Sequence, residues 1–244
     1  MDRIGKAAGG VAPVPRWNIK PDGRLLAEVS LWSADLANLE RDLERLSPYA
    51  DAFHLDVADA HFAPDLLFFP DLVAALRRHT ESPFHVHLMV EKPSKLVDRF
   101  VEAGADLITV HCETGRVDVR EAISRIRTHD CAAGVALRLE TPVSAVEPYL
   151  QQVSAVLLLG TMPGVKGREL ASEACGRIRS LAGLLEREGL RSQVVIVADG
   201  GIRTHTVPQL RAAGADAVVA GSLVFQAEDL SKTFAWLHSV GATP

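Results

Sequence analysis

The residues Val194-Val-Ile-Val-Ala-Asp-Gly-Gly201 open a stretch that contains one complete strand–helix–strand unit of this chain. An uninterrupted apolar run ends there in Asp199 and a glycine pair, which is typical of a strand with both faces covered. A helical pattern over Val207–Ala213 stops at Gly214, a residue that suits a helix C-terminus, and a second apolar run follows at Ala217–Ala220. This order predicts two strands of a parallel sheet joined by a helix.

The same alternation runs through nearly the whole chain. Short β-rich runs are expected at Leu25–Ser30, Ala52–Val57, Phe84–Met89, Asp106–His111, Ala133–Leu137, Ala155–Leu159, Val194–Asp199 and Ala217–Ala220. Helical patterns follow them at Leu36–Leu46, Phe69–Arg78, Ser94–Ala103, Val119–Thr128, Val143–Gln151, Glu169–Glu188, Val207–Ala213 and Leu230–Ser239. Strands that are each followed by a helix predict an α/β protein with a closed (β/α)8 TIM barrel, as a single domain over residues 24–244. A Rossmann fold is disfavoured because no GxGxxG motif follows the first strand.

Residues 1–23 lie outside this alternation. They contain Ala-Ala-Gly-Gly and Val-Ala-Pro-Val-Pro and show no apolar period. We therefore expect an N-terminal extension that is flexible or laid on the surface.

Composition excludes several classes of function. The 244 residues are 48% hydrophobic and 23% charged, which is ordinary for a soluble globular protein. A net charge of −5 without a basic stripe argues against a nucleic-acid partner. No apolar run is as long as a membrane span, which needs about 20 residues. The N-terminus lacks the apolar core of a secretory signal. Three scattered cysteines without CxxC spacing are expected to be reduced thiols, so the expected location is cytoplasmic, with no membrane partner.

Metal-capable side chains stand at the ends of three expected strands. His54 and Asp56 are two residues apart, as are His85 and His87, so each pair points to one face of its strand. Asp199 ends the seventh strand, and active sites of such barrels lie at the carboxyl ends of the strands. Imidazoles and carboxylates that face inward from three strands are what a divalent metal ion needs.

Glycine-rich loops follow the last three strands. They are Pro163-Gly-Val-Lys-Gly167, Gly200-Gly201 and Gly221-Ser222. Glycines let backbone N–H groups approach an anion closely, and a following helix N-terminus adds a favourable dipole. Loops after strands seven and eight are the usual phosphate cradle of this architecture, so a phosphorylated substrate is expected.

Ten ordered segments between Leu25 and Leu230 resemble the ribulose-phosphate 3-epimerase family, whose relatives include allulose-6-phosphate 3-epimerase. The segments are Ser30-Leu-Trp-Ser-Ala-Asp35, His54-Leu-Asp-Val57, His61-Phe-Ala-Pro64, His87-Leu-Met89, Thr109-Val-His-Cys-Glu113, Gly134-Val-Ala-Leu137, Thr141-Pro142, Pro163-Gly164, Asp199-Gly-Gly201 and Ala220-Gly-Ser222. Only the N-terminal extension and the last residues lie outside this resemblance.

The resemblance implies an isomerase that inverts C3 of a ketose phosphate, of the ribulose 5-phosphate and xylulose 5-phosphate type, through an enediolate. The family holds one divalent metal ion through positions that are here His54, Asp56, His87 and Asp199. Zinc is expected, with manganese, iron or cobalt as alternatives. Asp56 and Asp199 are expected to act as acid and base on opposite faces of C3, which requires their pKa values to be pushed apart.

The resemblance also implies the substrate contacts and the assembly. The expected contacts are Ser30, His87, Met89, Gly164, Gly167, Gly200, Gly201, Gly221 and Ser222. A homo-oligomer, dimer or hexamer, is expected, with Phe68-Phe69 as an apolar contact. His85 is expected to be a core or supporting histidine, and His111 and Glu113 to orient the metal ligands.

Some positions depart from the family pattern. The family has other residues at Ala58, Leu159 and Met162. Three cations, Arg138, Lys166 and Arg168, stand where the family has neutral residues, and they are candidates for extra anion contacts. These departures keep open an epimerase of the same family for another phosphorylated or nucleotide-linked sugar, such as allulose 6-phosphate.

Two further classes of function stay open. One is a phosphate-binding barrel with lyase or decarboxylase chemistry, as in barrels that carry Asp-x-Lys on a strand. No such lysine stands beside Asp56, which disfavours it. The other is a non-catalytic barrel, and the intact set of metal-capable residues argues against it.

Overall fold

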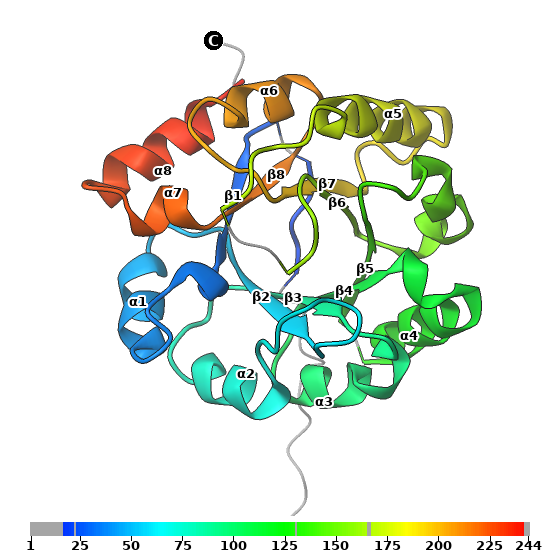
Figure 1. The fold of residues 1–244 in the computed structure, drawn as a ribbon, viewed down its shortest axis with the longest axis horizontal. Helices are drawn as coiled ribbons and strands as arrows, with labels where there is room; N and C mark the ends of the chain where they lie inside the picture. The colour runs from blue at the N-terminus through cyan, green and yellow to red at the C-terminus, as the bar shows by residue number, and fades with distance from the viewer. Residues whose placement is uncertain (1–16, 22, 130, 165–166, 242–244) are drawn as a thin grey trace, which may run out of the picture.

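The strands of this chain pair in sequence order and close on themselves. A computed structural model describes residues 17–21, 23–129, 131–164 and 167–241. Within these residues eight strands form one closed barrel in the order β1 to β8, and β8 pairs in parallel with β1. Figure 1 shows this ring of strands with the helices outside it. The predicted (β/α)8 barrel is confirmed.

The strand bounds agree with the prediction to within one residue at each end. The strands are β1 Leu26–Ser30, β2 Ala52–Ala58, β3 Phe84–Met89, β4 Leu107–His111, β5 Ala132–Leu137, β6 Ala155–Leu159, β7 Val195–Asp199 and β8 Ala217–Ala220. Nearly every residue in them is buried, as expected for a parallel sheet covered on both faces.

Helices cover the outside of the barrel between consecutive strands (Figure 1). The α-helices are α1 Leu39–Leu46, α2 Pro70–Arg77, α3 Val97–Glu102, α4 Arg116–Thr128, α5 Ala174–Arg187, α6 Val207–Ala212, α7 Ser222–Phe225 and α8 Leu230–Ser239. Short 3-10 helices are η1 Leu31–Ser33, η2 Pro93–Lys95 and η3 Cys112–Thr114, and a longer one is η4 Val143–Gln152. No helix of the described ranges is long and apolar enough to cross a membrane.

Three predicted helices differ in the structure. The helix expected at Val143–Gln151 is the 3-10 helix η4, which contains Pro148, a residue that has no N–H for an α-helical hydrogen bond. The helix expected from Glu169 begins only at Ala174, because Leu170 packs against the loop ends at Gly160 and Gly201. The pattern from Ser94 divides into η2 and α3, and the short helix α7 was not predicted.

The barrel interior is closed at its amino end by a residue of the N-terminal extension. Trp17 is only 6% exposed and packs with a cluster that includes the first residues of several strands: Leu26, Ala52, Leu107, Ala155, Val195 and Ala217. Most of the predicted extension, residues 1–16, lies outside the described residues. Its last part is therefore anchored in the barrel, at the end opposite the loops that follow the strands.

Candidate functional site

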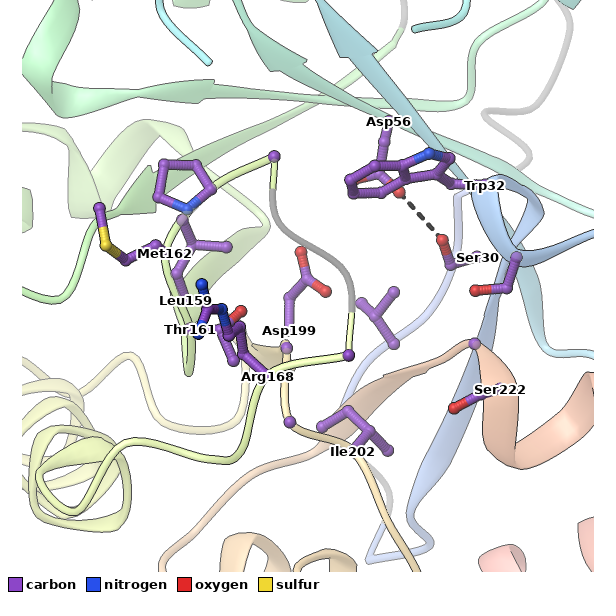
Figure 2. A pocket seen from close by; sticks show the side chains of 18 of the residues that line it. Ser30, Trp32, Asp56, Leu159, Thr161, Met162, Arg168, Asp199, Ile202 and Ser222 are labelled. Atoms are coloured by element: carbon purple, nitrogen blue, oxygen red, sulfur yellow. Dashed lines mark hydrogen bonds between the residues drawn. The ribbon is translucent and has the colours of Figure 1, made fainter. Parts of the chain in front are cut away.

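One cavity of about 280 Å³ lies at the carboxyl ends of the strands. Asp56 from β2 and Asp199 from β7 reach it from different strands, and Ser30 from β1 lies beside Asp56 (Figure 2). The other predicted contacts that line this cavity are Met89, Gly164, Gly167, Gly200, Gly201, Gly221 and Ser222. His54 and His87 have no exposed surface, so they stand behind the cavity wall and not on it.

The four predicted metal ligands lie together. One ligand atom from each of His54, Asp56, His87 and Asp199 lies within 4.8 Å of the other three. Asp56 Oδ1 is 3.4 Å from His54 Nε2 and 3.3 Å from His87 Nδ1. Asp199 Oδ2 is 3.9 Å from the first nitrogen and 3.7 Å from the second, and the two nitrogens are 3.5 Å apart.

These separations fit a divalent cation better than hydrogen bonds. Hydrogen bonds between nitrogen and oxygen centre near 2.9 Å, and the distances of 3.3 to 3.9 Å here are longer. Ligand atoms at about 2.0 to 2.2 Å around a tetrahedral cation stand roughly 3.4 Å from each other. Two imidazoles and two carboxylates also match the ligands that zinc and similar ions prefer.

The pKa values of the two carboxyl groups are pushed in opposite directions. Burial works against ionisation of Asp56, but His54 and His87 hold its pKa well below the ordinary value. Burial, and then the charge of Asp56, raise the pKa of Asp199. Burial opposes protonation of His54, yet the charge of Asp56 and further acidic partners raise the His54 pKa. A cation between these groups would favour the ionised form of both carboxyls.

A second histidine and a carboxylate stand behind His87. The Nε2 atoms of His87 and His111 are 2.9 Å apart, and His111 Nδ1 is 2.9 Å from Glu113 Oε2. Burial lowers the pKa of His111 to about 4, so it is neutral near pH 7 and donates through Nδ1 to the carboxylate. Its Nε2 then accepts from His87 Nε2–H, which leaves His87 Nδ1 with its lone pair toward Asp56 and Asp199.

The loops after β7 and β8 form the opposite side of the cavity. Gly201 has φ +71°, and a Cβ added there would lie 2.7 Å from the Cα of Leu170, so only glycine fits without strain. Ser222 begins helix α7 directly after β8, and a short extra helix at this place is common in phosphate-binding barrels. Figure 2 shows Ser222 and Asp199 around the same cavity.

The three cations proposed as extra anion contacts differ in position. Arg168 lines the cavity (Figure 2). Lys166 lies outside the described residues. Arg138 does not line the cavity, because its guanidinium lies 3.9 Å over the ring of Phe62 and donates to the Phe62 carbonyl oxygen. Arg138 is thereby engaged with the loop after β2, a contact that the sequence did not predict.

Some residues around the site were not predicted from the sequence. Thr161 and Arg203 line the cavity. Arg203 follows Asp199-Gly-Gly-Ile closely, and a cation in the loop after strand seven was a usable signal. Glu28 is buried beside His54, and no pattern in the sequence marks it as part of the site.

Comparison with solved structures supports the architecture alone. The 3-hexulose-6-phosphate synthase of Salmonella typhimurium superposes with a TM-score of 0.66 at 17% identity, over 88% of this chain and 98% of that one. The orotidine 5′-monophosphate decarboxylase of Methanocaldococcus jannaschii gives a TM-score of 0.64 at 12% identity, over 89% and 99%. Both similarities are in fold.

Comparison of sequences is more specific. The ribulose-phosphate 3-epimerase of Treponema pallidum (strain Nichols) is 39% identical over 197 residues, which is 80% of this chain and 89% of the relative. The ribulose-phosphate 3-epimerase of Bacillus subtilis (strain 168) is 34% identical over 204 residues, or 83% and 93%. The model of the "Ribulose-phosphate 3 epimerase family" matches residues 26–225, from β1 to α7. The chain belongs to the ribulose-phosphate 3-epimerase family, whose members are isomerases of sugar phosphates.

Proposed function

We propose that this chain is a metal-dependent ribulose-phosphate 3-epimerase that interconverts ribulose 5-phosphate and xylulose 5-phosphate. Family membership supports the reaction class. The observation that carries the metal dependence is the spacing of the ligand atoms of His54, Asp56, His87 and Asp199, which matches the edges of a cation's coordination shell.

The donor set suits zinc, and manganese, iron and cobalt are the alternatives. A divalent ion held by these four residues would supply Lewis acidity toward the oxygens of a ketose. Both histidines face the site with a nitrogen, and both aspartates with an oxygen. The residues present therefore fit the cation.

Inversion at C3 requires a base on one face of the carbon and an acid on the other. Asp56 and Asp199 approach the cavity from β2 and β7 (Figure 2). One carboxylate removes the C3 proton, and the other carboxyl group returns a proton on the opposite face. The two roles exchange when the reaction runs backwards.

The substrate's phosphate is assigned to the loops after β7 and β8. Gly201, Gly221 and Ser222 line the cavity on that side. Backbone N–H groups in such glycine turns bind phosphate oxygens. Ser30 is assigned to the reacting end of the sugar, because its hydroxyl lies beside Asp56.

A different sugar phosphate of the same family is the second candidate. Trp32, Met162 and Arg168 line the cavity and change its shape and charge. These residues favour a larger or more anionic ketose phosphate over a smaller one. Lyase chemistry is disfavoured, since no lysine lines this cavity among the described residues.

Homo-oligomer formation remains a proposal. Phe68 is buried, so Phe69, which is 57% exposed, is the member of the predicted pair that is available for a contact. Leu36 and Leu66 stand near it around the same apolar groove and are also exposed. Exposed apolar patches of this kind often mark contacts between subunits.

The test is product analysis by NMR with ribulose 5-phosphate and allulose 6-phosphate. The protein is loaded with zinc, manganese, iron or cobalt in separate samples. We expect the C3 epimer of ribulose 5-phosphate, loss of turnover in His54→Ala, and normal turnover in His129→Ala, which changes an exposed histidine. Folded protein that epimerises neither sugar with any of the four ions would refute the proposal.

A further inference from the structure

A carboxylate lies inside the barrel below the candidate metal centre. Glu28, at the middle of β1, is 1% exposed. Its Oε2 is 2.9 Å from Nδ1 of His54 and 2.7 Å from Nδ1 of His85. A buried carboxylate is costly unless it is hydrogen-bonded. Both contacts are made by Oε2, while Oε1 has no hydrogen-bond partner among the described residues, so the two contacts offset the cost of burial only in part.

The direction of these hydrogen bonds determines where the histidine protons are. Oε2 of Glu28 lies at hydrogen-bond distance from both Nδ1 atoms, and a carboxylate oxygen accepts hydrogen bonds, so both Nδ1 atoms carry a hydrogen. A neutral His54 then has its lone pair on Nε2, the atom that faces Asp56, Asp199 and His87.

His85 is held from its other side and does not reach the metal centre. Its Nε2 is 2.7 Å from the hydroxyl of Thr109, which donates to it. Gly134 leaves room for that hydroxyl, because a Cβ at this position would overlap Thr109 Oγ1. His85 thus fixes Glu28 and takes no part in the ligand set itself.

A residue of the N-terminal extension packs against His85 at the amino end of the barrel. The ring of Trp17 packs edge-on against the ring of His85, with centroids 5.7 Å apart. Trp17 and the apolar first residues of the strands keep solvent from the carboxylate. Hydrogen bonds to a charge are stronger where water is excluded.

We propose that Glu28 is a positioning residue that holds His54 with Nδ1 protonated and Nε2 directed at the metal ion, with His85, Thr109 and Trp17 as its support. The proposal rests on the proposed metal centre. In the proposal, Glu28 sets the tautomer of His54 by a direct hydrogen bond. Glu113 sets the tautomer of His87 in a similar way, but through His111, which lies between them. Such partners typically change metal affinity 10- to 100-fold when they are lost.

Two variants of Glu28 separate positioning from packing. Glu28→Met keeps the bulk but removes the acceptor, whereas Glu28→Gln keeps an acceptor oxygen and removes the charge. Glu102→Gln, on the exposed face of α3, is the control for loss of a carboxylate. Zinc affinity is measured by competition with a chromophoric chelator. Ring N–H signals are measured by NMR of ¹⁵N-histidine-labelled, metal-free protein at a pH where the ring ¹⁵N shifts show His54 to be neutral.

We expect wild type and Glu28→Gln to show the exchange-protected Nδ1–H of His54, and Glu28→Met to lose it. Zinc affinity should fall about 10- to 100-fold in Glu28→Met, less in Glu28→Gln, and not in Glu102→Gln. Affinity of Glu28→Met within threefold of wild type, or a loss in Glu28→Gln as large as in Glu28→Met, would overturn the proposal. If Glu28→Met does not fold, the NMR measurement on wild type is sufficient by itself: absence of a hydrogen on Nδ1 of His54 would overturn the proposal. Wild type that binds no divalent ion refutes the proposed function, while the N–H signals still report the contact of Glu28.

Discussion

The hydroxyl of Ser30 donates a hydrogen bond of 2.9 Å to Oδ2 of Asp56, and the other oxygen of that carboxylate faces His54 and His87. Ser30 is the last residue of β1 and pairs in register with His54 of the neighbouring strand β2, two residues before Asp56. Oδ2 of Asp56 is therefore held by Ser30, while Oδ1 faces the two histidines. In the proposed function, this division would let a single carboxylate serve both the cation and the substrate.

Ser30→Ala should lower kcat while leaving KM nearly unchanged. A hydrogen bond to a charged group contributes about 1.5 to 3 kcal/mol, so the expected loss is roughly 10- to 100-fold. Initial rates of epimerisation across substrate concentration measure it. Ser180→Ala, which removes a hydroxyl bonded only within α5, is the control. An unchanged kcat would show that Ser30 does not hold Asp56 for catalysis.

Gly201→Ala should raise KM strongly, because the added methyl group collides with the backbone of Leu170 and displaces the loop assigned to phosphate. The same substitution at Gly176, in α5, meets no atom within 4 Å. Gly176→Ala should therefore keep wild-type kinetics and gain about 0.5 to 1 kcal/mol of stability. Equal kinetics of the two variants would argue against the assigned phosphate loop.

Arg168→Ala should weaken substrate binding if this cation contacts an anionic group of the sugar phosphate. Arg168 lines the cavity and is exposed, so its contribution is screened by water. We expect KM to rise about 3- to 10-fold with kcat unchanged. Arg179→Ala, on the exposed part of α5, serves as the comparison. Indistinguishable KM values would leave Arg168 as a solvated loop charge.

Glu113 should make the barrel sensitive to acid. Burial raises its pKa, but His111 and further hydrogen-bond donors lower it from 4.5 to about 2. Its contribution to stability is therefore present above about pH 4.5 and is lost as the pH falls toward 2. Glu113→Gln should reduce the free energy of unfolding by about 1 to 3 kcal/mol at pH 7 and by much less at pH 2.5.

Denaturant unfolding at both pH values measures this difference. Glu121→Gln, at an exposed position of α4, controls for general loss of negative charge. A pH dependence that is identical in wild type and Glu113→Gln would contradict a role of Glu113 in acid sensitivity.

The strands and the four candidate metal ligands could be predicted from the sequence. The strands are short, mostly apolar runs, and Ser30, Asp56, His87 and Asp199 lie toward the carboxyl ends of four of them, so position along the strand already indicated the site. His54 with Asp56, and His87, share a face by the two-residue period of a strand. Only barrel closure brings Asp199 to the same place, and the strand count predicted that closure.

The support below the site was not predictable in the same way. Glu28 contacts His85 across 57 residues of sequence, and nothing in Leu-Ala-Glu-Val-Ser distinguishes a buried carboxylate from an exposed one. Trp17 lies in a segment without apolar periodicity, so its place in the barrel follows from its size and not from a pattern. The sequence position of Arg138, directly after Gly134-Val-Ala-Leu137, predicted a side chain near the site. In the structure its guanidinium packs on the ring of Phe62 instead.

Inversion of C3 by two carboxyl groups is tested most directly by the deuterium content at C3 after turnover in D2O. Ribulose 5-phosphate is incubated with the metal-loaded protein, and the first xylulose 5-phosphate formed is analysed by NMR. Proton return from Asp56 or Asp199 predicts solvent deuterium at C3 of the product, and loss of this exchange in Asp199→Asn but not in the exposed-site variant Asp98→Asn. Xylulose 5-phosphate that forms with its original C3 hydrogen would contradict the two-carboxylate account.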